Sequence, residues 1–120
     1  MTHSMEDYLK NILQIERDSG QVRSVDIAAK MQVTKPSVHN ALKVLTEEGL
    51  VTIGHGKRIF LTEKGREIAE NINQRHSFFS KMLVGAGIPE DTARDEACQM
   101  EHSVSESTFR ALEEKYSDKL

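Results

Sequence analysis

Apolar residues recur every three to four positions in the first half of the chain, the spacing that gathers them on one face of a helix. The pattern predicts three helices, over residues 5–18, 24–31 and 35–48. Hydroxyl side chains favour the position that begins a helix, so we expect Ser4, Ser24 and Thr34 to cap these segments. Pro36 would then lie in the first turn of the third helix, where its missing N–H costs little.

Two short apolar runs follow, over 50–53 and 58–61, with Gly54-His55-Gly56 between them. Such runs around a glycine-rich turn predict a β-hairpin. Gly49 is well placed for a left-handed cap of the third helix, and residues 21–23 could add an edge strand. The order helix, helix, tight turn, helix, hairpin predicts a winged helix-turn-helix.

The second half predicts helices only. Thr62 is expected to cap a long helix over 63–84, and Pro89 opens another that reaches about His102. Five residues of the long helix follow one another at steps of three or four and form a mainly apolar stripe along one face: Ile68, Ile72, His76, Phe79 and Leu83. A last helix holds Phe109, Leu112 and Tyr116. Three helices of this size bury little alone, so we expect a homodimer. The predicted fold class is mainly α, with a winged helix-turn-helix DNA-binding domain at 1–62 and an all-helical metal-binding and dimerisation domain at 63–120.

The net charge of −3 is unevenly distributed. Residues 1–62 carry eight Lys or Arg against seven Asp or Glu, and residues 63–120 carry eight against twelve. A locally basic surface on an acidic protein suits a small DNA footprint. The chain has no apolar run that could span a membrane and no apolar signal segment, and its single cysteine fits a reducing compartment. We therefore expect a cytoplasmic protein without a membrane partner.

The third predicted helix begins with polar side chains, and this end of a recognition helix enters the major groove. Asparagine can pair with adenine, lysine can reach guanine or phosphate, and the hairpin tip would meet phosphates as a wing. The predicted contacts with double-stranded DNA are Thr34, Lys35, Pro36, Ser37, His39, Asn40, Lys43, Lys57 and Arg58. Taken singly, each is more commonly a solvated surface residue, and some winged helices bind protein instead.

Cys98, Glu101 and His102 follow the spacing i, i+3, i+4, which places three metal-ligand types on one helix face. Alone, this triplet is more often a buried cysteine beside a solvated pair. His76 interrupts an apolar stripe at a core-facing step, either as a hydrogen-bonded core histidine or as a fourth ligand. Asp7 either belongs to the capping box or lends an oxygen from the DNA-binding half.

The chain resembles the diphtheria-toxin-repressor family of metal-dependent regulators, which includes the manganese-transport regulators. The resemblance covers nearly the whole chain. It rests on residues 4–9, the helix-turn-helix with Leu50 and the wing, 61–65, Arg75-His76 and 95–105.

The resemblance implies a transcription factor and not an enzyme, with operator DNA as its partner and a homodimer as its working form. It also implies a metal site built from Asp7, His76, Cys98, Glu101 and His102. Thr34, Pro36 and Asn40 would lie at base-reading positions, and Ser37, His39 and Lys43 near the DNA backbone.

The chain departs from the family pattern in its ligands. Asp7 is similar to the manganese branch and Cys98 to the iron branch. Lys10 stands where the manganese branch carries a carboxylate for a second metal, and Ser80 and Arg94 stand where the iron branch carries ancillary ligands. We therefore expect one divalent transition-metal ion per subunit. We also expect no SH3-like third domain after Leu120.

The predicted function is a repressor of metal homeostasis genes. A metal bonded to both halves would fix their orientation and hold two recognition helices about 34 Å apart, one turn of DNA. The thiolate favours Fe²⁺, Co²⁺ or Zn²⁺, whereas the carboxylates favour Fe²⁺ and Mn²⁺. Fe²⁺ is the favoured metal and Mn²⁺ the next, while Zn²⁺ and Co²⁺ are expected to bind in vitro.

Two alternatives remain open at this point. A winged-helix regulator that answers to an organic ligand or a partner protein would show no metal dependence and would have an apolar pocket in its dimerisation half. A zinc enzyme would need an open coordination position and a positioned general base. The sequence shows no second acid–base cluster, so we expect neither catalytic residues nor a small organic substrate.

Overall fold

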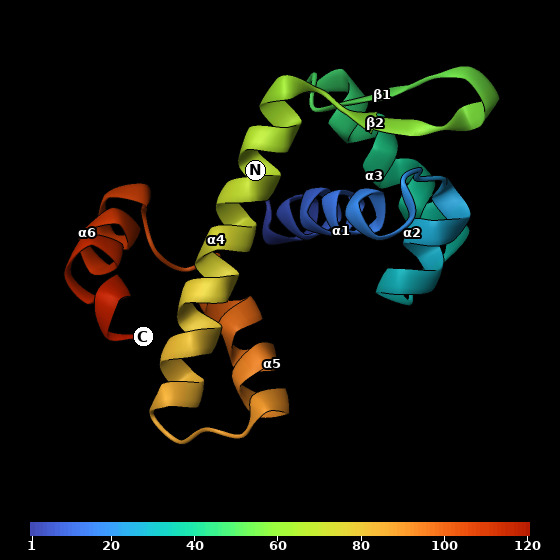
Figure 1. Ribbon diagram of the computed structural model, residues 1–120. Coiled ribbons are helices and arrows are strands. Elements are labelled where there is room, and N and C mark those ends of the chain that lie inside the picture. The colour runs from blue at the N-terminus through green and yellow to red at the C-terminus, as the bar shows by residue number, and fades with distance from the viewer. The chain divides into compact units, whose positions relative to one another are not determined.

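The computed structural model describes residues 1–120 and divides them into two units, Met1–Glu70 and Asn71–Leu120. Helix α4 contributes residues to both. Figure 1 shows the order of the elements along the chain. The first unit holds α1 (His3–Ser19), α2 (Ser24–Met31), α3 (Lys35–Glu47), β1 (Val51–Ile53), the short 3-10 helix η1 (His55–Lys57), β2 (Ile59–Leu61) and the start of α4 (Glu63–Gly85). This order confirms the predicted winged helix-turn-helix.

Helix α3 forms where its periodicity predicted it. Thr34 caps it, since its Oγ1 accepts a hydrogen bond of 3.3 Å from the N–H of Ser37, and Pro36 lies in the first turn. One face is buried, and that face consists of Val38, Ala41, Leu42 and Leu45. Gly49 follows with a φ of 74°, the left-handed conformation expected of it.

The caps of the first two helices differ from the prediction. Helix α1 begins earlier, because the Oγ1 of Thr2, not of Ser4, accepts the N–H of Met5 at 3.2 Å. In α2 the capping position belongs to Arg23, whose N–H donates to the carboxylate of Asp26 at 2.9 Å. Sequence spacing leaves a choice between neighbouring polar residues, and the backbone conformation decides it.

The hairpin is a two-stranded antiparallel sheet in which Val51 pairs with Leu61 and Ile53 with Ile59. The edge strand considered for residues 21–23 does not form, because α2 starts at once and leaves a single backbone hydrogen bond of 2.8 Å, from the N–H of Ile59 to the carbonyl of Val22.

The start of α4 packs closely against Gly49 and Leu50, which join α3 to β1. Thr62 caps the helix by accepting the N–H of Gly65 at 3.1 Å, and its own hydroxyl donates to the carbonyl of Gly49 at 2.7 Å. A side chain at Gly65 would collide with the carbonyl group of Leu50, so only glycine fits there. The core of this unit draws on all its elements, and its largest fully buried members include Leu9, Ile12, Leu13, Ile27, Leu45 and Leu50.

The second unit contains the rest of α4, α5 (Glu90–Met100), α6 (Glu106–Tyr116) and the short η2 (Ser117–Lys119). Its core is an aromatic cluster in which Phe78 packs edge-to-face on Phe79 and on Phe109, with ring centroids 5.4 and 5.7 Å apart. Helix α5 ends two residues before the expected His102. None of the helices is both long and apolar enough to cross a bilayer.

Candidate metal centre and nucleic-acid interface

Helices α4 and α5 bring three metal-ligating side chains together in the second unit. His76 lies on α4, Cys98 on the last turn of α5, and Glu101 immediately after that helix. One ligand atom from each lies within 4.8 Å of the others. The Sγ of Cys98 is 3.6 Å from the Nδ1 of His76, which is 3.3 Å from the Oε2 of Glu101.

His102 extends this cluster from the other side of the carboxylate. Its Nε2 lies 3.6 Å from the Oε1 of Glu101, and its side chain is only 3% exposed. The side chain of Glu101 is completely buried. Although the helix ends at Met100, Glu101 keeps helical angles and its N–H bonds to the carbonyl of Ala97, which preserves the predicted i, i+3, i+4 arrangement.

The donor set fits a divalent transition-metal ion. Two ligands on one such ion, bonded at about 2.0 to 2.3 Å, lie roughly 3 to 4 Å apart. The distances from the Nδ1 of His76 to the Sγ of Cys98 and to the Oε2 of Glu101 fall in this range. A buried carboxylate is costly unless a positive charge compensates it, and a cation among the ligands would do so. Thiolate, imidazole and carboxylate together suit Fe²⁺, Co²⁺ and Zn²⁺ better than Mg²⁺ or Ca²⁺.

Asp7 belongs to α1 in the first unit, where its backbone carbonyl accepts a hydrogen bond of 2.8 Å from Asn11. Its part in a metal site stays a prediction. The three departures from the family pattern lie on helices: Lys10 on α1, Ser80 on α4 and Arg94 on α5. None of these three side chains is an ordinary metal ligand.

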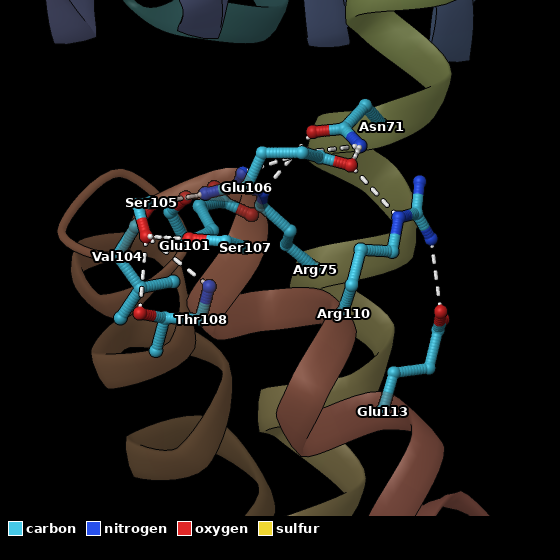
Figure 2. A network of polar contacts seen from close by, with 10 residues as sticks. All are labelled: Asn71, Arg75, Glu101, Val104, Ser105, Glu106, Ser107, Thr108, Arg110 and Glu113. Carbon is cyan, nitrogen blue, oxygen red and sulfur yellow. Dashed lines mark hydrogen bonds and ion pairs between the residues drawn. The ribbon is translucent and has the colours of Figure 1, made fainter.

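Arg75 is the residue of this region whose role the sequence reasoning missed. It precedes His76 and is only 7% exposed. Figure 2 shows its guanidinium among polar groups from three segments. The Nη1 donates to the carbonyls of Glu101 and Val104, at 3.2 and 2.6 Å. The sequence does indicate that Arg75 is buried, because it stands three residues after Ile72 and four before Phe79. This spacing places it on the same face of α4 as these two apolar residues.

The remaining donors of Arg75 face two polar side chains. Its Nε donates to the Oδ1 of Asn71 at 3.0 Å, and its Nη2 pairs with the carboxylate of Glu106 at 2.9 Å. The hydrogen bond from Arg75 lowers the pKa of Glu106 below its usual value, with a smaller contribution from Arg110. A charged pair with several hydrogen bonds can tolerate burial that an isolated guanidinium cannot.

The outward side of α3 is the candidate nucleic-acid interface. All seven residues predicted there are exposed: Thr34, Lys35, Pro36, Ser37, His39, Asn40 and Lys43. The hydroxyls of Thr34 and Ser37 lie 2.9 Å apart, so they also stabilise the beginning of the helix. The buried face of α3 thus leaves this polar N-terminal end available for a groove.

The two cations expected at the tip of the wing differ in their exposure. Lys57 is exposed at the tip, whereas Arg58 is half-buried with its guanidinium carbon 5.7 Å from the centre of the Phe60 ring. A Cβ added to Gly56 would lie 3.9 Å from the Nη2 of Arg23, which places a further cation beside the wing. The sequence reasoning missed Arg23, because the approach of residues 21–23 to the hairpin is a tertiary contact.

A groove of about 710 Å³ separates α3 from the hairpin. Leu42, Ile53 and Ile59 give it an apolar lining, and two cations, Lys43 and Lys57, border it together with one acid, Glu47. A recognition helix and a wing with cations between them suit a polyanion.

Comparison with known proteins assigns both halves of the chain. Residues 1–59 match the family model described as iron dependent repressor, N-terminal DNA binding domain. Residues 62–118 match the model described as iron dependent repressor, metal binding and dimerisation domain.

Individual relatives extend over most of the chain. The transcriptional regulator MntR of Escherichia coli O6:H1 is 35% identical over 118 residues, which cover 96% of this chain and 76% of MntR. The iron-dependent repressor IdeR of Mycobacterium tuberculosis H37Rv is 28% identical, over 93% of this chain and 49% of IdeR. The solved structure of the manganese regulator SloR has a TM-score of 0.83 and 32% identity, over 98% of this chain. The chain spans 55% of the SloR chain, about half its length.

Proposed function

Because the chain belongs to the diphtheria-toxin-repressor family of metal-dependent transcriptional regulators, we propose that it represses transcription by binding operator DNA when it holds a divalent metal ion. The family consists of transcriptional regulators, which confirms that the chain is not an enzyme. The observation that carries the proposal is the cluster of His76, Cys98 and Glu101, whose ligand atoms lie within 4.8 Å of one another.

The residues that would hold the ion are His76, Cys98, Glu101 and His102, with Asp7 as a further ligand. The first four are supported by their distances in the second unit. Asp7 is supported by the family resemblance and by its carboxylate. A bound ion would supply positive charge and link its ligands into one arrangement. We propose one ion per subunit, since Lys10, Ser80 and Arg94 replace the donors of a second site.

The proposed metal is Fe²⁺, with Mn²⁺ next. Relatives are named for each, since SloR is a manganese regulator and IdeR an iron-dependent repressor. The thiolate of Cys98 favours the softer Fe²⁺, whereas the carboxylates accept either ion. We propose that the regulated genes serve metal homeostasis and that the protein acts in the cytoplasm, a reducing compartment in which Fe²⁺, a thiolate ligand and DNA coexist.

The proposed DNA contact uses the exposed end of α3 and the wing. Asn40 with Thr34 and Pro36 would read bases, while Lys57 and Arg23 would meet phosphates. The second unit matches a model described as a dimerisation domain, and we propose a homodimer. Two copies would then present their α3 helices to successive major grooves, about 34 Å apart. The functional boundary proposed for the chain lies at Thr62, where α4 begins.

A DNA-binding titration tests the proposal. A duplex is selected from a random-sequence pool by the wild-type protein with Mn²⁺, and its binding is measured by fluorescence anisotropy across titrations of Mn²⁺ and, anaerobically, of Fe²⁺. We expect the wild-type protein to bind tightly only with metal. In His102→Ala, adding metal should no longer raise the affinity for DNA. Gln99→Ala, an exposed neighbour on α5 without a ligand atom, is the matched control. Binding that needs no metal would instead favour a regulator of the organic-ligand or protein-partner class.

Calorimetry of the metal-free protein tests the number of ions. We expect about one ion per subunit for both metals, and two per subunit would refute the single-site proposal. Linkage requires that metal and operator strengthen each other's binding by the same factor, typically about 5- to 150-fold.

A further inference from the structure

Arg75 is a buried cation immediately beside a proposed metal ligand. It lies on α4 between Ile72 and Phe79, in the apolar surroundings of the second unit, and is 7% exposed. Arginine is rarely buried to this extent unless hydrogen bonds and an opposite charge compensate it. Its guanidinium carbon also lies 5.3 Å from the centre of the Phe109 ring, so the guanidinium group is fixed by packing as well as by hydrogen bonds.

The hydrogen bonds of Arg75 reach the segment that carries two proposed ligands. Its Nη1 donates to the carbonyl of Glu101 at 3.2 Å and to the carbonyl of Val104 at 2.6 Å, so one nitrogen spans the segment 101–104 (Figure 2). This segment follows the end of α5. Carbonyls at a helix C-terminus have no partner within the helix, and here the guanidinium supplies one.

Two other residues orient the guanidinium. Asn71, one turn earlier on α4, accepts from the Nε at 3.0 Å. Glu106, in the first turn of α6, pairs with the Nη2 at 2.9 Å and also accepts from Asn71 at 3.1 Å. The planar fork of an arginine therefore joins α4, the segment 101–104 and α6, a geometry that a lysine cannot reproduce.

We infer that Arg75 is a positioning residue of the metal centre, which holds Glu101 and His102 in place for the ion although it contacts no metal itself. The inference rests on the proposed metal site. The side chains of His76 and Arg75 leave the same helix in succession, so α4 supplies one ligand directly and, through the carbonyls of Glu101 and Val104, holds the segment that carries two others. Without these bonds the segment 101–104 would have to be ordered when the metal binds, and that entropy cost lowers the affinity.

The test compares Arg75→Lys with Arg110→Lys. Lysine at 75 keeps the charge but loses the fork. Arg110 pairs with the same Glu106 at 2.8 Å and with Glu113 at 2.8 Å, and both of these partners lie on α6 rather than in the segment 101–104, so it is the matched control. The affinity for Mn²⁺ is measured by competition with a fluorescent chelator, and the Co²⁺ complex by its absorption spectrum. Amide hydrogen exchange of Glu101 and Ser103 is followed in the metal-free protein.

We expect Arg75→Lys to weaken Mn²⁺ binding by about 10- to 100-fold, to alter the Co²⁺ spectrum and to speed exchange at Glu101 and Ser103. Arg110→Lys should leave all three within about twofold of wild type. Equal affinities and equal exchange in the two variants would overturn the inference. A wild-type protein that binds neither Mn²⁺ nor Co²⁺ would overturn the proposed metal site itself, and the inference with it.

A second variant covers the case in which Arg75→Lys does not fold. Asn71→Ala keeps the Arg75 charge and its pair with Glu106 but removes the acceptor that orients the Nε. We expect it to fold and to bind Mn²⁺ several-fold more weakly, with faster exchange at Glu101. Wild-type affinity and exchange in this variant would count against a positioning role.

Discussion

The Sγ of Cys98 lies 3.6 Å from the Nδ1 of His76, so a thiol from the end of α5 faces an imidazole from the middle of α4. The Oε2 of Glu101 lies 3.3 Å from the same nitrogen. A soft ligand and a hard one therefore share one small, largely buried site. This pairing makes the choice of metal depend on position 98.

Replacing Cys98 with glutamate should move the metal preference toward manganese. The change exchanges a soft thiolate for a hard carboxylate at the same place, so affinity for Co²⁺ should fall and affinity for Mn²⁺ should be kept or improved. Chelator competition with each ion gives the ratio of the two dissociation constants. The wild-type Co²⁺ complex should show a thiolate-to-cobalt absorption band that the variant lacks. An unchanged ratio would mean that the thiolate does not bind the metal.

Asn40→Ala should weaken sequence-specific DNA binding and little else. Asn40 is exposed on the outward face of α3, where its amide can pair with an adenine edge. Loss of such a pair costs about 1–3 kcal/mol for each half-site of the selected duplex, and a dimer loses one pair in each half-site. Affinity for a scrambled duplex of equal length should stay unchanged, because that binding rests on phosphates. Equal losses on both duplexes would contradict base reading by Asn40.

Lys57→Gln should instead reduce the salt dependence of binding. Lys57 is exposed at the tip of the wing, and each lysine–phosphate pair contributes about 0.9 to the steepness of log affinity against log salt. The substitution removes one pair from each subunit, so the slope for a bound dimer should become shallower by about 1.8. The slope is measured by anisotropy at several NaCl concentrations. Lys64→Gln removes an exposed cation at the start of α4 and is the control, for which we expect the wild-type slope. The same slope for all three proteins would exclude Lys57 from the contacts with phosphate.

The element order could be predicted because periodicity records which side of a helix or strand is buried. The buried face of α3, from Val38 to Leu45, follows directly from that pattern. The choice of Thr2 over Ser4 as a cap could not, because both are hydroxyl residues near the same helix end. Backbone geometry alone separates them.

The clustering of the candidate ligands was predictable to a similar degree. Helical spacing puts Cys98, Glu101 and His102 on one side, and the interrupted stripe singles out His76. The hydrogen bonds of Arg75 join residues 26 and 29 positions apart, and no local pattern contains that information. Such contacts depend on where α5 ends relative to α4.

Glu106→Gln should make the stability of the protein less dependent on acid pH. Arg75 lowers the pKa of Glu106 from its usual 4.5, so the ionised carboxylate stabilises the fold at neutral pH. This contribution is complete above about pH 4.5 and is lost as the pH falls through the lower, folded-state pKa. Because the Glu106 side chain is 55% exposed, solvent screens the pair and we expect a difference of about 1 kcal/mol or less at neutral pH.

Urea unfolding at several pH values between about 7 and 3 measures this difference in the free energy of unfolding. The gap between wild type and Glu106→Gln should narrow as the pH falls below 4.5 and should shrink in high salt. Glu114→Gln, an exposed carboxyl on the same helix, is the control. A gap that stays constant with pH would show that the ionised form of Glu106 contributes nothing.

Gly65→Ala should destabilise the first unit, because the steric cost of the new side chain exceeds the gain from the higher helix propensity of alanine. The new Cβ would lie 2.9 Å from the carbonyl carbon of Leu50, and backbone atoms cannot move aside as a flexible side chain can. Overpacking of this kind costs about 1–3 kcal/mol.

Gly85→Ala is the matched control, because that Cβ meets no atom within 4 Å at the end of the same helix. There, alanine should be neutral or stabilising, by up to about 1 kcal/mol. Urea unfolding of the metal-free protein, at one fixed protein concentration, compares the two variants. Similar free energies of unfolding for both would show that α4 can shift away from Leu50 at no cost.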